Sequence, residues 1–349
     1  MNKGQKDSAY YTYIPALDTL RFIVFLFILA NHSRINSTLN GGHSFFFTLT
    51  GFLISYISIS EIREKGHFNF SRYLARRFLR TLPLFFTIVA LCFFLKIISQ
   101  SFFERTITTG KLWPYLLLIH NYFDLDILFP LANLWAMSVT EQYYFLLGLL
   151  FFFVYPLWKW FGVLFVVVGL TINMISYFIW DHYNYAYSWY FLINFGVGNL
   201  LALFCVERNR LFQKFSGLNR SMTFLYFLAG IILLIIGFSI SHDAFLPFKE
   251  IVLSVGYSLI IFNVSFGIYR PSLITDIGWF QYLGKRTLGM YCWHAPIMTL
   301  LSKAAGFYDV VLTPSLMFVT TLILVIPVSI LSYKYYESYF LRLKKYFNS

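Results

Sequence analysis

The chain has 349 residues, of which 58% are hydrophobic, 22% are aromatic and only 12% are charged. One soluble core of this size cannot bury so much apolar surface, so the composition excludes an ordinary soluble domain. The net charge of +12 is explained by orientation in a membrane and attraction to anionic lipid, so we expect membrane lipid and no nucleic acid as a partner.

Apolar runs long enough to cross a hydrocarbon core as helices recur along the chain. They predict an all-α polytopic transmembrane bundle, a single membrane domain over residues 1–349 with no fused soluble domain. Ten spans are predicted, at residues 14–31, 44–60, 78–98, 132–155, 161–180, 188–205, 223–240, 249–267, 282–302 and 314–333. The apolar run 112–122 is too short for a regular span, so we expect it to be re-entrant or interfacial, with an eleventh span as the alternative.

Basic residues gather in three connections, at residues 61–80, at 206–223 and in the tail after residue 333. The positive-inside rule puts all three in the cytoplasm, and ten spans satisfy this with both termini inside. We therefore expect a multi-pass protein of the inner (plasma) membrane. The three cysteines lie singly within apolar runs, without the spacing of a metal site, and no metal is expected.

Ionisable side chains inside spans are costly and are therefore functional candidates. The first span carries Arg21 and His32, which are eleven residues apart and so fall on nearly the same helix face, roughly 16 Å apart along the axis. The arrangement indicates a charge at the inner end and a titratable base at the outer end. Alternatively, Arg21 extends to the inner headgroups beside Asp18, and His32 is an interfacial residue.

Three arginines, Arg76, Arg77 and Arg80, open the third span. The i,i+3 spacing of Arg77 and Arg80 puts them on one face, where a pair of guanidinium groups can grip a phosphate. The alternative is a membrane anchor at the cytoplasmic surface.

The fourth span concentrates polar residues near its outer end, with Ser138, Glu141 and Gln142 within five positions. Glu141 is expected at the depth of His32, and a carboxylate that orients an imidazole is a common arrangement for a general base. Its alternative role is that of a structural partner for an arginine or a backbone amide.

His294 lies in the ninth predicted span, two residues before Pro296. It can line the site, or it can satisfy a backbone group at the proline kink, which is the interpretation we favour.

Several sequence segments, taken in their order along the chain, resemble those of the acyltransferase-3 family of membrane O-acyltransferases. The resemblance rests on residues 14–21, the arginine-ten-residues-histidine motif ending at His32, residues 45–54, the Arg-x-x-Arg motif within 76–83, residues 135–144, residues 291–296 and the closing Tyr336-Glu337. Departures are Thr50 where a serine is usual, Thr140 in place of the first of two glutamates, and Ser338 in place of a common proline.

The resemblance implies transfer of an acyl group, usually acetyl, from cytoplasmic acyl-coenzyme A as co-substrate to a hydroxyl of a surface or envelope glycan acceptor. In the resulting hypothesis Arg76, Arg77 and Arg80 hold the donor phosphates, and the arm of the donor passes Arg21. His32, oriented by Glu141, then deprotonates the acceptor. Four further residues are predicted to line the site: Thr50, Ser138, Gln142 and His294.

Other interpretations stay open. Direct transfer and a covalent acyl-enzyme are both compatible with the sequence. A transporter or exporter of a glycan or lipid-linked precursor is the main alternative from another class, because buried charges also suit a substrate pathway. A structural subunit of a polysaccharide synthase is a third. A homo-oligomer, or association with glycan-assembly proteins, is also left open.

Overall fold

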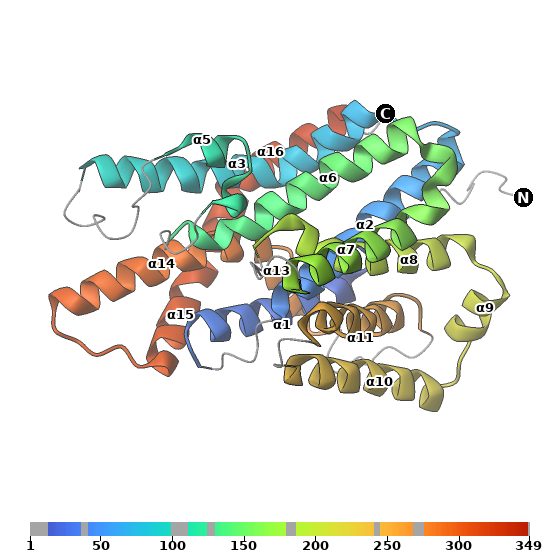
Figure 1. Ribbon diagram of the computed structural model, residues 1–349. Coiled ribbons are helices and arrows are strands. Elements are labelled where there is room, and N and C mark those ends of the chain that lie inside the picture. The colour runs from blue at the N-terminus through green and yellow to red at the C-terminus, as the bar shows by residue number, and fades with distance from the viewer. Residues whose placement is uncertain are drawn as a thin grey trace, which may run out of the picture.

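The computed structural model describes residues 13–35, 41–98, 111–123, 130–178, 186–240, 245–267 and 276–347. Within these ranges the chain is a bundle of helices without a strand (Figure 1). The long helices are α1 (Pro15–His32), α2 (Gly42–Lys65), α3 (Phe70–Ile98), α6 (Trp135–Phe153), α7 (Phe161–Phe178), α8 (Leu192–Glu207), α10 (Arg220–Ser239), α11 (Leu246–Phe266), α14 (Thr287–Phe307) and α15 (Pro314–Ser332).

Shorter helical segments connect or extend these helices. They are α5 (Trp113–Leu116), the 3₁₀ turns η1 (His120–Tyr122), η2 (Ala132–Leu134), η3 (Tyr155–Trp160) and η4 (Ser188–Phe191), α9 (Arg210–Ser216), α13 (Gly278–Gly284), the π-helical η6 (Tyr333–Glu337), α16 (Ser338–Leu343) and η7 (Lys344–Phe347).

The predicted polytopic helical bundle is confirmed. In the described part of the chain, nine helices are long and apolar enough to cross a membrane, and they match nine of the ten predicted spans. The tenth, predicted at 282–302, corresponds to α14, a 21-residue helix that is not among those nine. The last two residues of the span predicted at 161–180 lie outside the described residues.

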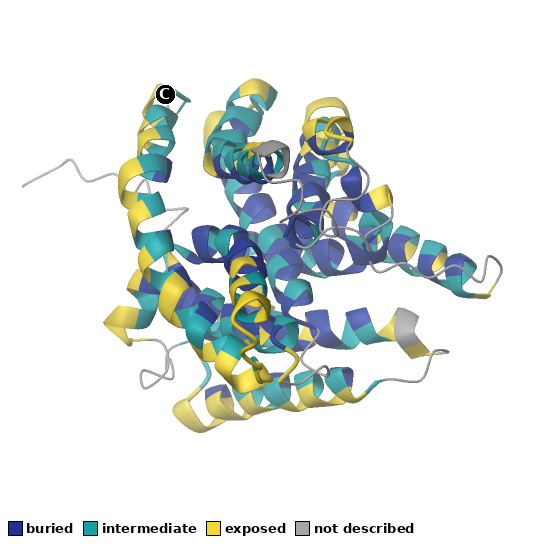
Figure 2. Ribbon diagram, turned by 90° about the vertical axis from the view of Figure 1, so that its left-hand side faces the viewer, coloured by how far each residue is buried: buried dark blue, intermediate teal, exposed yellow. Residues whose placement is uncertain are grey.

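The helices at the edge of the bundle are apolar on the outside, as lipid requires. On α10 the buried positions are Thr223, Gly230 and Gly237, whereas Phe224 and Ile235 are exposed. The buried positions of α15 are likewise small or polar, apart from one valine. Figure 2 shows buried residues gathered in the centre and exposed ones along the peripheral helices. The central helices therefore form the place where a polar site can be sheltered from lipid.

Two glycines bring α2 and α8 into backbone contact at the centre of the bundle. A Cβ at Gly198 would lie 2.1 Å from the carbonyl oxygen of Thr48, and one at Gly51 would lie 2.3 Å from that of Phe195. Small residues permit such close approach of membrane helices, which strengthens their packing. The contact fixes the face of α2 that carries His43 and Thr50.

The apolar run 112–122 does not form a spanning helix. It forms the four-residue α5, a residue with positive φ at Leu118 (57°) and the turn η1. The segment returns to α6, where the side chain of Gln142 binds it through the carbonyl oxygen of Leu118 at 2.6 Å and Oδ1 of Asn121 at 2.9 Å. The prediction that this run is not a regular span is therefore confirmed.

Candidate active site

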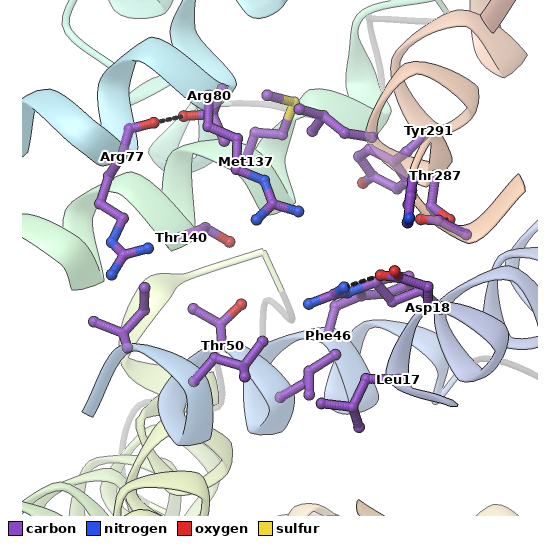
Figure 3. A pocket seen from close by; sticks show the side chains of 18 of the residues that line it. Leu17, Asp18, Phe46, Thr50, Arg77, Arg80, Met137, Thr140, Thr287 and Tyr291 are labelled. Atoms are coloured by element: carbon purple, nitrogen blue, oxygen red, sulfur yellow. Dashed lines mark hydrogen bonds and ion pairs between the residues drawn. The ribbon is translucent and has the colours of Figure 1, made fainter. Parts of the chain in front are cut away.

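A cavity of about 650 Å³ lies between the central helices and has the size of a site for a small organic ligand. Its walls come from the start of α1, from α2, α3, α6 and α14, and from the C-terminal segment η6 to η7. Figure 3 shows Thr50 on α2 and Thr140 on α6 pointing into this space, with Arg77 and Arg80 of α3 above them. Segments far apart in the sequence therefore contribute to a single chamber.

One part of the cavity is strongly basic. It is lined by Arg77, Arg80, Lys285 and Lys344, which come from α3, from the residue after α13 and from the first position of η7. Lys344 lies close enough to Arg77 and Arg80 to interact electrostatically with both guanidinium groups. Several cations that line one cavity can bind a ligand that carries several phosphates.

Arg21 also lines the cavity, but its charge is balanced. It forms an ion pair with Asp18, a carboxylate that is 1% exposed and also accepts a hydrogen bond from the hydroxyl of Tyr13. A Cβ at Gly284 would lie 1.9 Å from the carbonyl oxygen of Asp18, so only glycine lets α13 approach α1 this closely. This contact holds the Arg21–Asp18 pair at the wall.

Arg76 does not join the other two arginines of α3. Its guanidinium binds Glu61 of α2 at 2.5 Å, and Lys65 reaches the same carboxylate at 3.5 Å. Consecutive helix residues point about 100° apart, so Arg76 and Arg77 cannot both face the cavity. The structure thus places Arg77 and Arg80 at the cavity and Arg76 in an ion pair between α2 and α3.

His32 and His294 form a pair at the end of α1. Nδ1 of His32 lies 2.8 Å from Nε2 of His294, and the two rings are stacked with centroids 5.0 Å apart. His294 is fully buried, whereas His32 is only partly buried. Sequence reasoning favoured a role for His294 in satisfying the carbonyl that Pro296 frees, which in a helix is that of Cys292. Its Nδ1 instead binds the carbonyl of Tyr291, at 2.7 Å. The same ring therefore also positions His32.

The hydrogen bonds decide which nitrogen of each ring carries the proton. A carbonyl oxygen can only accept, so Nδ1 of His294 donates to Tyr291. With both rings neutral, Nε2 of His294 is then an acceptor, and Nδ1 of His32 must donate to it. This leaves the lone pair of His32 on Nε2, where it can take a proton from a hydroxyl group.

Sequence reasoning missed His43, which follows the first glycine of α2 and lines the cavity. Its ring centroid lies 6.2 Å from that of His32 and 4.8 Å from that of Trp135. Nε2 of His43 lies 3.5 Å from the hydroxyl of Tyr291, which itself donates to the carbonyl of Asn133. His43 thus connects the end of the cavity to the His32–His294 pair. A histidine one position before the predicted span 44–60 was the signal that could have found it.

The predicted contact of Glu141 with His32 is not made: among the described residues, the hydrogen-bond partner of the Glu141 carboxylate is the hydroxyl of Thr81. The second carboxylate oxygen, Oε2, has no hydrogen-bond partner within the described residues. Glu141 lines the cavity and is 2% exposed. The contact was inferred from a predicted equal depth in the membrane, but α6 turns Glu141 toward Thr81 of α3.

Ser138 and Gln142 face away from the cavity, toward the segment that contains α5 and η1. Oγ of Ser138 lies 3.1 Å from Nδ1 of His120, and Gln142 binds Asn121 as described above. Their polarity in the fourth span is explained by the docking of this segment. Thr50, by contrast, lines the cavity as predicted for a site-lining residue.

These features define a membrane-embedded chamber with basic lining residues and, next to His43 at its wall, a pair of hydrogen-bonded imidazoles. A family model described as an acyltransferase domain matches residues 14–334, and the chain therefore belongs to the acyltransferase-3 family. This membership places it among the acyltransferases. No solved structure matches the chain.

Curated proteins similar to this chain include the peptidoglycan O-acetyltransferase OatA of Listeria monocytogenes serovar 1/2a, 23% identical over 315 residues that cover 82% of this chain and 50% of that protein. The putative peptidoglycan O-acetyltransferase YrhL of Bacillus subtilis (strain 168) is 25% identical over 319 residues, 83% of this chain and 49% of the relative. An uncharacterized protein of Haemophilus influenzae is 29% identical over 179 residues, 46% of this chain and 73% of that protein. The chain thus spans about half the length of the two named relatives.

Proposed function

We propose that the protein transfers an acyl group, in the first instance acetyl, from acyl-coenzyme A to a hydroxyl of a surface or envelope glycan or of its precursor. The observation that carries this proposal is a single cavity whose lining includes Arg77, Arg80, Lys285, Lys344 and His43. His32 does not line this cavity, but its ring centroid lies 6.2 Å from that of His43. Two relatives are named as a peptidoglycan O-acetyltransferase and a putative one, and these names support acetyl as the group and a glycan as the acceptor.

The donor would bind with its phosphates at Arg77, Arg80, Lys285 and Lys344 and with its thin arm inside the cavity. Charge-assisted hydrogen bonds from arginine to phosphate supply the anchoring. The arm of coenzyme A contains amide groups that need hydrogen-bond partners once they are desolvated. The unpaired Oε2 of Glu141 supports a role as acceptor for one such amide N–H.

His32 would act as the general base. Its Nε2 takes the proton of the acceptor hydroxyl as the oxygen attacks the thioester carbonyl, so that a C–O bond forms and the C–S bond breaks. The thiolate of coenzyme A leaves and recovers that proton from His32. His294 holds the imidazole through its Nδ1, so His294 is a positioning residue.

The positive-inside pattern supports the sidedness of this scheme. It would put the basic part of the cavity on the cytoplasmic side of the inner (plasma) membrane, where acyl-coenzyme A is available, and His32 toward the outer side. The imidazole of His32, with its lone pair on Nε2, supports transfer over transport, because a transporter has no need of a general base.

The test uses a strain that lacks the gene and is complemented with wild-type protein, with His32→Ala or with His67→Ala as control. His67 is an exposed histidine next to the end of α2. Mass spectrometry of the surface glycan should show acyl esters with the wild type and His67→Ala, and none with His32→Ala. Purified wild-type protein in liposomes should release free coenzyme A when acyl-coenzyme A and acceptor are present. Wild-type ester levels in the His32→Ala strain would exclude the assignment of the base, and glycan esters unchanged by deletion of the gene would exclude the function.

A further inference from the structure

Two segments that lie between spans meet beside α6, at the end of the bundle where α1 ends. One contains η1 and the other is η4, and Gln142 of α6 binds both. Its Oε1 accepts hydrogen bonds from Ser188 and, at 3.2 Å, from the hydroxyl of Tyr122. Asn121 joins the two segments directly, through Nδ2 to Oγ of Ser188 and to the carbonyl of Ala186, at 3.1 Å in each case.

This frame of amide and hydroxyl groups holds three aromatic rings together: Tyr122, Tyr187 and Trp189, called here the rim cluster. The Tyr122 and Tyr187 rings are stacked with centroids 5.6 Å apart and planes 25° apart. Trp189 lies 5.4 Å from Tyr122 and 4.7 Å from Tyr187. Tyr122 is 36% exposed and the other two rings are partly exposed, so the cluster presents aromatic surface outward.

The rim cluster connects to the histidines through a row of rings. Phe191, two residues after Trp189 in η4, stacks on Trp135 with centroids 5.5 Å apart. Trp135 in turn contacts the ring of His43, which neighbours His32. Phe191 and Trp135 are each 4% exposed, so this row of rings fixes where the rim cluster lies relative to the histidines and is not itself a path for a ligand.

The chemistry of the rim cluster fits a sugar. A pyranose ring has an apolar face of C–H groups that can lie against an aromatic ring, and a rim of hydroxyls that need donors and acceptors. The rim cluster supplies the aromatic faces, and the hydrogen-bonded frame of Gln142, Asn121 and Ser188 fixes their orientation. Aromatic residues that only anchor a protein at the lipid headgroups need no such frame of buried amides.

We propose that Tyr122, Tyr187 and Trp189 form the subsite that docks a pyranose ring of the acceptor glycan. This inference rests on the proposed function, because it supplies the acceptor side of that reaction. It adds what the family does not provide: the place on this chain where the sugar binds.

The variants Trp189→Ala and Tyr122→Ala test the subsite, with Trp189→Phe and Tyr122→Phe as conservative partners. Trp279→Ala is the matched control, since Trp279 is 56% exposed and stacked on Tyr282 at 5.2 Å, but belongs to α13. Each protein is assayed in the deletion strain for esters on the strain's own glycan. In liposomes, acetyl-coenzyme A and an N-acetylglucosamine tetrasaccharide serve as donor and acceptor probe.

We expect each alanine variant to lower glycan ester and to raise the acceptor concentration for half-maximal rate about 10-fold, a magnitude typical of losing one aromatic contact. The KM for acetyl-coenzyme A should stay at the wild-type value, and the phenylalanine variants should retain most activity. Trp279→Ala should behave as wild type.

Three outcomes would overturn the proposal. If the alanine variants esterify the glycan as the wild type does, the subsite is wrong while the proposed function stands. If they lower thermal stability and both donor and acceptor kinetics equally, the rings only anchor the protein in the membrane. If the wild type itself forms no glycan ester in the cell, the proposed function fails, and the subsite fails with it.

Discussion

The hydrogen bond between His32 and His294 makes a quantitative prediction. In His294→Ala, the Nδ1–H of His32 loses its acceptor, at present 2.8 Å away, and the ring loses the neighbour on which it stacks. A buried donor left without a partner costs about 1–3 kcal/mol. If that loss falls on the reactive orientation of the imidazole, the rate of transfer decreases by about 5- to 150-fold.

The variant His294→Gln tests whether His294 acts by orienting the imidazole of His32. The side-chain oxygen of glutamine can stand near the position of Nε2 and accept the bond from His32, so we expect it to recover much of the activity lost in the alanine variant. The assay is the initial rate of coenzyme A release in liposomes, at varied acyl-coenzyme A and saturating acceptor. The effect should fall on kcat, with the KM for the donor changed less than about two-fold, because His294 does not line the donor cavity.

Two results would refute this reasoning. The first is a kcat of His294→Ala equal to that of the wild type, which would mean that His32 needs no positioning partner. The second is a decrease confined to the KM for the donor, which would mean that His294 acts through the shape of the cavity. His67→Gln serves as the control for a histidine change outside the site.

Three further predictions follow from the contacts described above. Arg80→Ala should raise the KM for acyl-coenzyme A by about 10- to 100-fold, which corresponds to the loss of a charged hydrogen bond. Arg76→Ala should leave this KM within about two-fold of the wild-type value, because Arg76 is paired with Glu61. Equal effects of the two variants in steady-state kinetics would contradict the assignment. Gly198→Ala should force α2 and α8 apart, lower the free energy of unfolding by about 1–3 kcal/mol and lower the midpoint of thermal unfolding in detergent. An unchanged midpoint would show that the two backbones can separate without cost. Burial lowers the pKa of His120, which lies outside the spanning helices, to about 3. Below pH 6.5 the unfolded chain therefore binds a proton that the folded chain does not, and the free energy of unfolding falls by about 1.4 kcal/mol per pH unit. His120→Gln should narrow the difference between the unfolding midpoints at pH 7 and pH 5, and an equal difference in both proteins would contradict this prediction.

Hydropathy predicted the bundle well because lipid leaves a chain no alternative to helices with apolar outer faces. The span predicted at 282–302 corresponds to α14, whose polar residues, His294 among them, keep it out of the nine helices that are apolar enough by composition to cross a membrane. Its length and burial place it with the other long helices. The spans most exposed to lipid, α10 and α15, were the easiest to recognise for the converse reason.

The candidate site was only partly predictable. Sequence spacing fixes where a residue lies along a helix and on which face, but not which neighbouring helix that face meets. This is why Glu141 was assigned to His32 although it binds Thr81, and why Gln142 was assigned to the site although it holds the segment after α5. Spacing within one helix was more reliable: Arg77 and Arg80 do share a cavity.

The pairing of Arg21 with Asp18 and the wall of rings around Trp135 bear on membrane permeability. A chamber that opens to a polyanionic donor on one side and approaches an acceptor on the other could leak ions down the membrane potential. Because the Arg21–Asp18 pair is neutral, the attraction for anions is concentrated at the basic part of the cavity. Phe47, Trp135 and Phe191, packed with centroids 4.5–6.0 Å apart, close the other end with apolar surface that disfavours a continuous column of water. If donor and acceptor approach from opposite sides, as proposed above, this wall of rings would keep the membrane closed to ions between them.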